Sequence, residues 1–403
     1  MATDPSNYSV NQSGSGNGND PQLPPGEART LKSPKEAIRP VKPPKAPKRS
    51  RHARNRWVIA LNFFFSFAVL AMIAAGGLFY WGSQEYVKPG PLTKATRVVV
   101  PKGAGLRSIG DALGRNQVID SALLFWASVR LQKKEDALKA GEYLFDQGVS
   151  MRDVVEKLVE GKSILYKITL PEGLTSQQIV TLLRENDVLT GEISEIPPEG
   201  SLLPNTYTFG RGASRPQIIE RMKTAQDNAL KRIWERRVGD LPIKSPEELV
   251  ILASIVEKET AKADERPRVA GVFINRLRRG MRLQSDPTII YGIFGGAGKP
   301  KDRPILQSDI TGATPYNTYV IPALPPTPIA NPGLAAMEAV ASPSVTDELY
   351  FVADGTGGHV FAETLDAHNN NVRRWRQIEA ERKATDEKKQ EAPVPAKQAP
   401  TNQ

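Results

Sequence analysis

Two glutamates that follow an apolar run are the residues of this sequence best suited to acid–base chemistry. The stretch ILASIVEKETA, residues 251–261, is apolar up to Glu257, and Glu259 follows two positions later. On a helix these two positions point about 200° apart, so at most one of them faces a given groove. A carboxyl group among apolar neighbours resists ionisation and keeps its proton, as a general acid must.

The helical neighbours of the two glutamates distinguish them. Small residues that leave space beside the side chain surround Glu257: Ala253, Ser254 and Ala261. Glu259 has β-branched residues behind it and Lys262 ahead, which predicts an ion pair on the surface. The alternative is that both glutamates lie on a solvated helix end, and the helix alone does not decide between these interpretations.

Other polar groups in the same part of the chain could complete a site. Glycoside hydrolysis commonly uses two carboxylates about 5 to 9.5 Å apart, and the sequence does not say whether Asp264, Glu265 or Asp286 comes so close to Glu257. Residues predicted to bind substrate, because polar or aromatic groups cluster with the acid, are Asn275, Gln284, Asp286, Tyr316 and Asn317. Loop scaffolding is the alternative role for each of them.

Composition excludes several other chemistries. The sequence has no cysteine, which removes thiol catalysis, thiolate zinc sites and disulfides. Of its three histidines, only His359 and His368 lie in a segment expected to fold, and their spacing matches no metal-ligand pattern. No G-x-S-x-G elbow is present. We therefore predict no metal and no cofactor.

The elements that must hold these residues are predicted from capping and periodicity. A helix begins with Ser245 as N-cap, Pro246 at its first position and Glu248 completing a capping box. A second helix is predicted at 265–279. Long Gly/Pro/Asn-rich loops follow, and a β-hairpin is predicted at 349–364.

An internal repeat precedes this region. VVVPKGAGLRSIGDALGRNQVI, residues 98–119, matches ITLPEGLTSQQIVTLLRENDVL, residues 168–189. Each copy is predicted to be a strand, a Pro-x-Gly turn and a helix. The first copy continues with a helix near 121–131, a strand at 140–145 and a helix near 150–160. This β-α-α-β order over residues 96–164 resembles LysM, a glycan-binding module.

The N-terminal part of the chain predicts a membrane anchor. Residues 57–81 contain no charge and are long enough to cross the hydrocarbon core of about 30 Å. Residues 1–56 are predicted to be a disordered basic tail and residues 82–95 a linker. Eleven Lys or Arg precede the span and few follow it, which predicts a cytoplasmic N-terminus.

The charge of +10 is thereby assigned mostly to the tail, which argues against a nucleic-acid partner. At the other end, residues 377–403 are charged and rich in Pro and Gln, and a second disordered tail is predicted there.

Several linked motifs together resemble the YceG-like family of endolytic murein (peptidoglycan lytic) transglycosylases, over about residues 96–376. They are ILASIVEKETA, VFINRLRRGMRLQSDPTIIYG, TPYNTY, LPPTPIANPG and LYFVADGTGGHVF. The resemblance implies an α+β fold with a single N-terminal transmembrane helix, a LysM-like βααβ subdomain, and a mixed α/β catalytic domain with an acid-bearing helix at 165–376. It also implies anchoring in the inner (cytoplasmic) membrane with the catalytic domain in the periplasm.

The same resemblance implies cleavage of the MurNAc–GlcNAc bond of nascent peptidoglycan strands, leaving 1,6-anhydroMurNAc ends and terminating elongation. The catalytic glutamate of the family, the first in Glu-Lys-Glu-Thr, maps onto Glu257. Asn205 stands where the family pattern leads us to expect Asp, which puts any carboxylate role there in doubt. The implied partners are peptidoglycan strands and the membrane, with peptidoglycan synthases as candidates.

One carboxyl group suffices for this reaction, because the attacking group is the C6 hydroxyl of the substrate itself. Two alternatives stay open: a muramidase-type hydrolase that uses water, and a non-catalytic peptidoglycan-binding scaffold.

Overall fold

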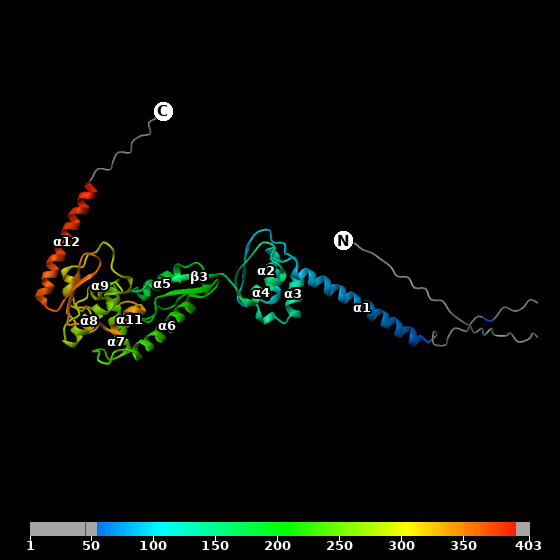
Figure 1. Ribbon diagram of the computed structural model, residues 1–403, viewed down its shortest axis with the longest axis horizontal. Coiled ribbons are helices and arrows are strands. Elements are labelled where there is room, and N and C mark those ends of the chain that lie inside the picture. The colour runs from blue at the N-terminus through cyan, green and yellow to red at the C-terminus, as the bar shows by residue number, and fades with distance from the viewer. Residues whose placement is uncertain (1–44, 46–54, 392–403) are drawn as a thin grey trace, which may run out of the picture. The chain divides into compact units, whose positions relative to one another are not determined.

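The computed structural model describes Lys45 and residues 55–391 (Figure 1). Helix α1, Arg56–Val87, is the one helix among these residues long and apolar enough to cross a membrane. It contains the predicted span 57–81 and continues into the predicted linker, 82–95, because no Gly or Pro interrupts residues 83–87. Nearly all of the predicted tail, 1–56, lies outside the described residues.

The first copy of the repeat and the residues that follow it, up to Glu160, form a small α/β unit with its own core. Its elements are β1 (Thr96–Val100), α2 (Leu106–Arg115), α3 (Ala122–Leu131), η2 (Glu135–Ala137), β2 (Gly141–Phe145) and α4 (Met151–Glu160). Strands β1 and β2 pair antiparallel, with Val98 opposite Tyr143. Val98, Phe125, Tyr143 and Leu158 belong to one buried cluster. The predicted β-α-α-β order is confirmed.

The second copy repeats the strand–turn–helix plan. Its elements are β3 (Leu165–Thr169), α5 (Ser176–Glu185), β4 (Thr206–Gly210) and α6 (Arg215–Glu235), and β3 pairs antiparallel with β4. Gly103 and Gly173 occupy the same place between strand and helix, with φ of +79° and +75°. Glycine is the residue that adopts this left-handed conformation without strain, which explains why both copies keep the Pro-x-Gly turn.

Helix α7, Pro246–Glu259, lies at the centre of the largest core. The Ser245 hydroxyl accepts the N–H of Glu248 at 3.2 Å, as its capping role predicts. The Glu248 carboxylate instead accepts the N–H of Lys244, at 2.6 Å. Residues 249–256 are buried all round the helix, and α8 (Arg266–Arg278) and α11 (Leu334–Ala341) pack against it.

The remaining elements follow α8 in the chain. They are α9 (Asp286–Phe294), η3 (Gly295–Ala297), α10 (Gln307–Thr311), β5 (Tyr350–Ala353), β6 (His359–Ala362) and α12 (Leu365–Glu391). Strands β5 and β6 form the predicted hairpin. The prediction of a disordered tail at 377–403 is wrong as far as residue 391, where α12 ends. The Glu, Lys, Arg and Ala residues of this segment are strong helix formers and extend the helix.

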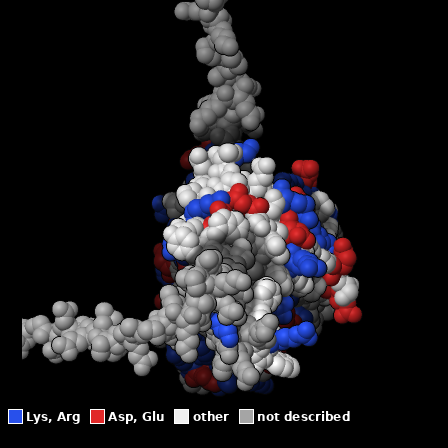
Figure 2. Space-filling view, turned by 90° about the vertical axis from the view of Figure 1, so that its right-hand side faces the viewer, with Lys and Arg blue, Asp and Glu red and all other residues white. Residues whose placement is uncertain are grey.

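The described residues thus form a mixed α/β structure with three two-stranded sheets. Each of three hydrophobic clusters supports its own group of elements. Figure 2 shows basic and acidic side chains intermixed on one face of the described chain. On that face they are not gathered into a surface of one sign.

Candidate active site

Helix α7 brings both candidate acids to the polar end of a buried element. Its apolar residues anchor it in the core, and its last turn carries Glu257, Lys258 and Glu259 before the helix ends at Thr260. A helix fixed along most of its length holds its terminal side chains in set directions. The two glutamates therefore meet different surroundings, as their spacing predicts.

The Glu257 side chain is held by contacts from two other segments. One carboxylate oxygen, Oε2, accepts the backbone N–H of Gly333 at 3.0 Å, at the N-terminus of α11. The other, Oε1, lies 3.3 Å from Nη2 of Arg266, in the first turn of α8. The side chain is only 5% exposed. The carboxyl group is thus enclosed and oriented.

A second carboxylate lies close to Glu257. Glu172 comes from the Pro-x-Gly turn of the second repeat, and its Oε2 lies 3.4 Å from the same Nη2 of Arg266. Both carboxylate oxygens contact Nη2 of Arg266, at 3.3 and 3.4 Å, so a second carboxylate shares the cation that contacts Glu257. The structure thus supplies the neighbouring acid that the sequence did not identify.

The pKa of Glu257 is raised, and burial is the largest cause. The Gly333 N–H lowers this pKa, the Glu172 carboxylate raises it, and the cations of Arg266 and Lys258 lower it. Burial therefore favours the protonated form, while one N–H and two cations are in place to stabilise the anion. A group that must first donate and then accept a proton needs both conditions.

Glu259 is not the surface residue that its sequence neighbours predict. Its Oε1 accepts a hydrogen bond from the Ser285 hydroxyl at 2.5 Å, and burial raises its pKa to about 7. The expected partner, Lys262, lies 3.9 Å from Glu265 instead. The prediction failed because helix periodicity describes α7 alone, whereas Ser285 arrives from a loop 26 residues away.

Burial of Glu259 predicts a specific dependence of stability on pH. An ordinary glutamate of the unfolded chain ionises near pH 4.5, whereas Glu259 in the folded protein ionises only near pH 7. The free energy of unfolding should therefore fall between about pH 4.5 and pH 7, by on the order of 3 kcal/mol, and then level off. Glu259→Gln should remove most of this fall in denaturant titrations at pH 5 and pH 8. An equal fall in both proteins would contradict the assignment.

Two of the predicted substrate-binding residues instead support the fold. Nδ2 of Asn275 donates to the carbonyl oxygens of Thr346 at 2.6 Å and Glu348 at 3.1 Å. Asn317 is fully buried, and its Nδ2 donates to three backbone carbonyl oxygens, those of Asp309, Ile310 and Gly312. Amides that donate to backbone carbonyls fix loops. These contacts favour loop scaffolding, the alternative role, for both residues, and substrate binding by them stays a prediction.

Of the other three, Gln284 and Asp286 adjoin Ser285, the hydrogen-bond partner of Glu259, whereas Tyr316 contacts other residues. Gln284 and Asp286 flank Ser285, and both side chains are exposed. Asp286 accepts a hydrogen bond from the Tyr319 hydroxyl at 2.7 Å, and its charge raises the pKa of Glu259. Tyr316 shares a hydrogen bond with Thr327 and packs edge-on against Tyr291. Among the described contacts, none joins these residues to Glu257.

Sequence reasoning missed Arg266 and Gly333, which contact the Glu257 carboxylate, and Glu172, which contacts the same Arg266 nitrogen. For Glu172 a signal existed: the first copy of the repeat has Lys102 at the matching position, so the charge is reversed where the two turns otherwise agree. A Cβ on Gly333 would lie 1.9 Å from Oε1 of Glu172, so any other residue there would have to displace the Glu172 side chain. Neither Arg266 nor Gly333 stands out in the sequence.

His359 and Asn205 lie apart from the Glu257 contacts. The Glu265 carboxylate accepts the backbone N–H of His359 at 3.0 Å, and its other oxygen lies 2.8 Å from Nδ1 of the His359 ring. These two contacts fix the start of β6. The Asn205 side chain accepts the N–H of Thr206 at 2.6 Å, a local contact. Within the described residues, no group of three His, Asp or Glu side chains is arranged to hold a metal ion.

Comparison with known proteins gives consistent matches. The endolytic murein transglycosylase of Bacillus subtilis (strain 168) is 31% identical over 327 residues, covering 73% of this chain and 89% of that protein. The enzyme of the same name from Streptococcus pneumoniae serotype 2 (strain D39) is 31% identical over 365 residues and covers 77% of this chain, which spans 64% of the length of that relative.

A crystal structure of a yceG-like protein from Listeria monocytogenes is 31% identical and covers 69% of this chain and 99% of that one, with a TM-score of 0.42. The family model described as the YceG-like family matches residues 98–374, the segment that contains Glu172, Glu257, Arg266 and Gly333. The chain belongs to the YceG-like family.

Proposed function

We propose that this protein is a peptidoglycan lytic transglycosylase, a carbon–oxygen lyase that cleaves glycan strands internally, with Glu257 as its acid and base. Membership of the YceG-like family and the relatives named endolytic murein transglycosylase support the activity. The observation that carries the assignment of Glu257 is its enclosed carboxyl group, with a raised pKa and with the Gly333 N–H and Arg266 as partners for the anion.

The reaction needs one proton donor and no water. Protonated Glu257 gives its proton to the glycosidic oxygen between MurNAc and GlcNAc, and the bond from that oxygen to C1 of MurNAc breaks. The C6 hydroxyl oxygen of the same MurNAc bonds to C1, and the Glu257 carboxylate takes the hydroxyl proton. The products are a 1,6-anhydroMurNAc end and a free GlcNAc hydroxyl, and Glu257 is again protonated.

A muramidase-type hydrolase is the second candidate, and one observation favours it. The Glu172 carboxylate contacts the same Arg266 nitrogen as Glu257, so a second carboxylate is present beside the acid, as a two-carboxylate mechanism requires. Mass spectrometry of products from purified full-length protein distinguishes the two. Anhydro ends support the transglycosylase, reducing ends would establish the hydrolase, and strand binding without cleavage would indicate a non-catalytic scaffold.

The remaining features fit an anchored enzyme. We propose that α1 spans the inner membrane once, with a cytoplasmic N-terminus, and that the rest of the chain acts in the periplasm. The length and composition of α1 and the basic residues before it support this arrangement. The β-α-α-β unit at 96–164 would act as a LysM-like glycan-binding subdomain beside a catalytic domain at 165–376. Peptidoglycan synthases are candidate partners in the membrane.

Two charge changes should move the pH profile of the reaction in opposite directions. Glu172→Gln removes an anion that raises the pKa of Glu257, so the basic limb of the profile should shift to lower pH. Arg266→Gln removes a cation that lowers this pKa, so the same limb should shift to higher pH. Rates of anhydro-end release from pH 4 to 9 measure both shifts. Shifts of the same sign would contradict this account.

A further inference from the structure

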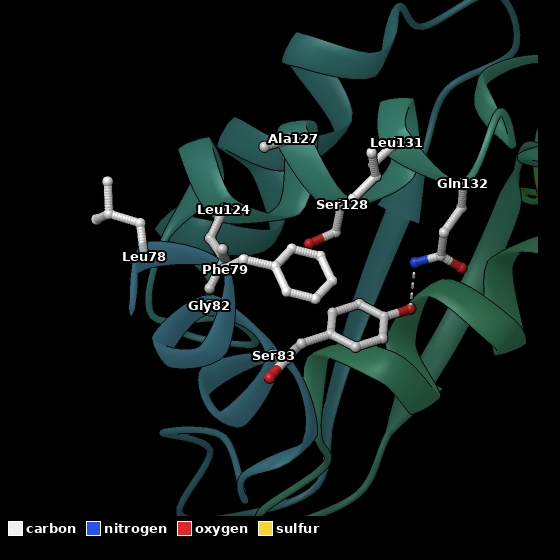
Figure 3. A pocket seen from close by; sticks show the side chains of 10 residues that line it. Leu78, Phe79, Gly82, Ser83, Leu124, Ala127, Ser128, Leu131 and Gln132 are labelled. Carbon is white, nitrogen blue, oxygen red and sulfur yellow. Dashed lines mark hydrogen bonds between the residues drawn. The ribbon is translucent and has the colours of Figure 1, made fainter. Parts of the chain in front are cut away.

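We propose that the outer face of α3, together with the last turns of α1, lies in the membrane interface and binds lipid acyl chains. This inference rests on the proposed membrane anchor. It adds to the anchor a second contact with the bilayer, made by the unit that follows it. Figure 3 shows the groove between the two helices on which the argument depends.

Helix α3 is apolar on both sides. Its inner side buries Phe125 and Val129 completely. On its outer side, Leu123 is 73% exposed and Leu131 is 72% exposed, with Ala127 between them at the same helical spacing. Single exposed leucines are common in soluble proteins, whereas an aligned apolar row on a helix indicates a surface that is covered in use.

The apolar row continues into a groove of about 280 Å³ between α3 and α1. Leu78 and Phe79 of α1 and Leu124 and Leu131 of α3 are among its lining residues. The two helices are joined at the far end of the groove by Nε2 of Gln132, which donates to the Tyr86 hydroxyl at 3.0 Å (Figure 3). Residues of both helices therefore line the groove, and one hydrogen bond joins the two helices.

The position of the groove along α1 fixes its depth in a membrane. Leu78 and Phe79 belong to the uncharged stretch 57–81, and they are 68% and 67% exposed. At a rise of 1.5 Å per residue that stretch is about 37 Å long, so its final residues lie at the boundary of a hydrocarbon core of about 30 Å. The groove that Leu78 and Phe79 line therefore lies at the same boundary.

The polar groups of α3 suit that depth. Arg130 lies over the ring of Trp126, with its guanidinium carbon 5.3 Å from the ring centroid. Lys133 and Lys134 follow the helix. Indole rings and cations beside an apolar face are the pattern of helices that lie in the interface, where the cations meet lipid phosphates.

Lipid is the occupant that these observations favour. Leu78 and Phe79 line the groove and are exposed, and as residues of α1 they must face lipid if α1 spans the bilayer. A second copy of this chain or a helix of another membrane protein would need to displace that lipid. The following experiment distinguishes lipid from a second copy.

The absence of cysteine from the chain allows a clean labelling experiment. Full-length Leu131→Cys carries an environment-sensitive fluorophore in nanodiscs of phosphatidylethanolamine and phosphatidylglycerol, with one copy per disc. We expect strong quenching by lipids with a nitroxide near the headgroup and weaker quenching by lipids with a nitroxide near the chain end. The matched control is Ser108→Cys, at an exposed position of α2, which should be quenched by neither.

A label in the middle of α1, at Phe67→Cys, separates the two claims. If the Phe67→Cys label is quenched by deep nitroxides and the Leu131→Cys label by none, the anchor stands and the inference about α3 is overturned. If the Phe67→Cys label is not quenched, the anchor itself fails. Quenching of the Leu131→Cys label that disappears when a second copy shares the disc would assign the groove to that copy and overturn the lipid assignment.

Discussion

Glu257→Gln is expected to lower the release of anhydro ends by at least about 100-fold, because positioned proton transfer contributes roughly 10²- to 10⁴-fold. The amide cannot donate a proton of comparable acidity to the glycosidic oxygen or accept one from the C6 hydroxyl. Its oxygen can still accept the Gly333 N–H, which lies 3.0 Å from Oε2 of the native carboxylate. The melting temperature should therefore change little.

The matched control is Glu235→Gln, the same chemical change at an exposed position at the end of α6. It should keep full activity. Both variants are compared with the wild type by initial rates on peptidoglycan strands and by thermal unfolding. A folded Glu257→Gln protein with more than a tenth of wild-type activity would remove Glu257 from the proposed role. Glu259→Gln is the wrong control, since that side chain is buried against Ser285.

The sequence predicts the elements of this fold better than the contacts between them. The N-terminus of helix α7 is predicted by the Ser245 cap and Pro246, and its buried residues form a continuous apolar run in the sequence. The repeat predicts two strand–turn–helix units, and both are present. Such signals are local, because capping, turns and periodicity depend on residues within a few positions of each other.

The surroundings of the acid depend instead on residues far apart in the chain. Glu172 and Arg266, which are in contact, are 94 positions apart in the sequence, and Gly333 and Glu257 are 76 positions apart. No periodicity links such residues, so the family resemblance, rather than physical reasoning, selected Glu257 from the sequence. Because sequence patterns do not reveal such long-range contacts, Glu259 was expected at the surface. For the same reason Asn275 and Asn317 were expected to bind substrate, although their amides contact loop carbonyls.

Asn331 is the residue that joins these distant segments. Its Oδ1 accepts the N–H of Leu202 at 3.0 Å, and its Nδ2 donates to the Leu174 carbonyl and the Ser176 hydroxyl, each at 3.1 Å. Its backbone carbonyl accepts the N–H of Gly173 at 3.0 Å. The residue is fully buried. It therefore ties the turn that carries Glu172 to the segment that supplies Gly333.

Asn331→Ala should consequently destabilise the protein and also lower its activity. Removal of the amide leaves the buried Leu202 N–H and Leu174 carbonyl without these partners, which predicts a loss of about 2 to 4 kcal/mol in the free energy of unfolding. The Glu172 turn keeps its backbone bonds to residue 331 but loses the side-chain bonds of Asn331. Its position beside Glu257 should therefore loosen, and activity should fall about tenfold or more at temperatures where the variant is folded.

Asn317→Ala provides the comparison that separates these two effects. Asn317 is equally buried, and its amide also serves backbone carbonyls, but those carbonyls lie in residues 309–312 and do not touch the Glu172 turn. It should lose similar stability in denaturant titrations and keep most of its activity when folded. Equal activity in the two folded variants would mean that the Glu172 turn has no part in positioning the acid. A selective loss in Asn331→Ala would tie catalysis to the contact between the second repeat and the segment that precedes α11.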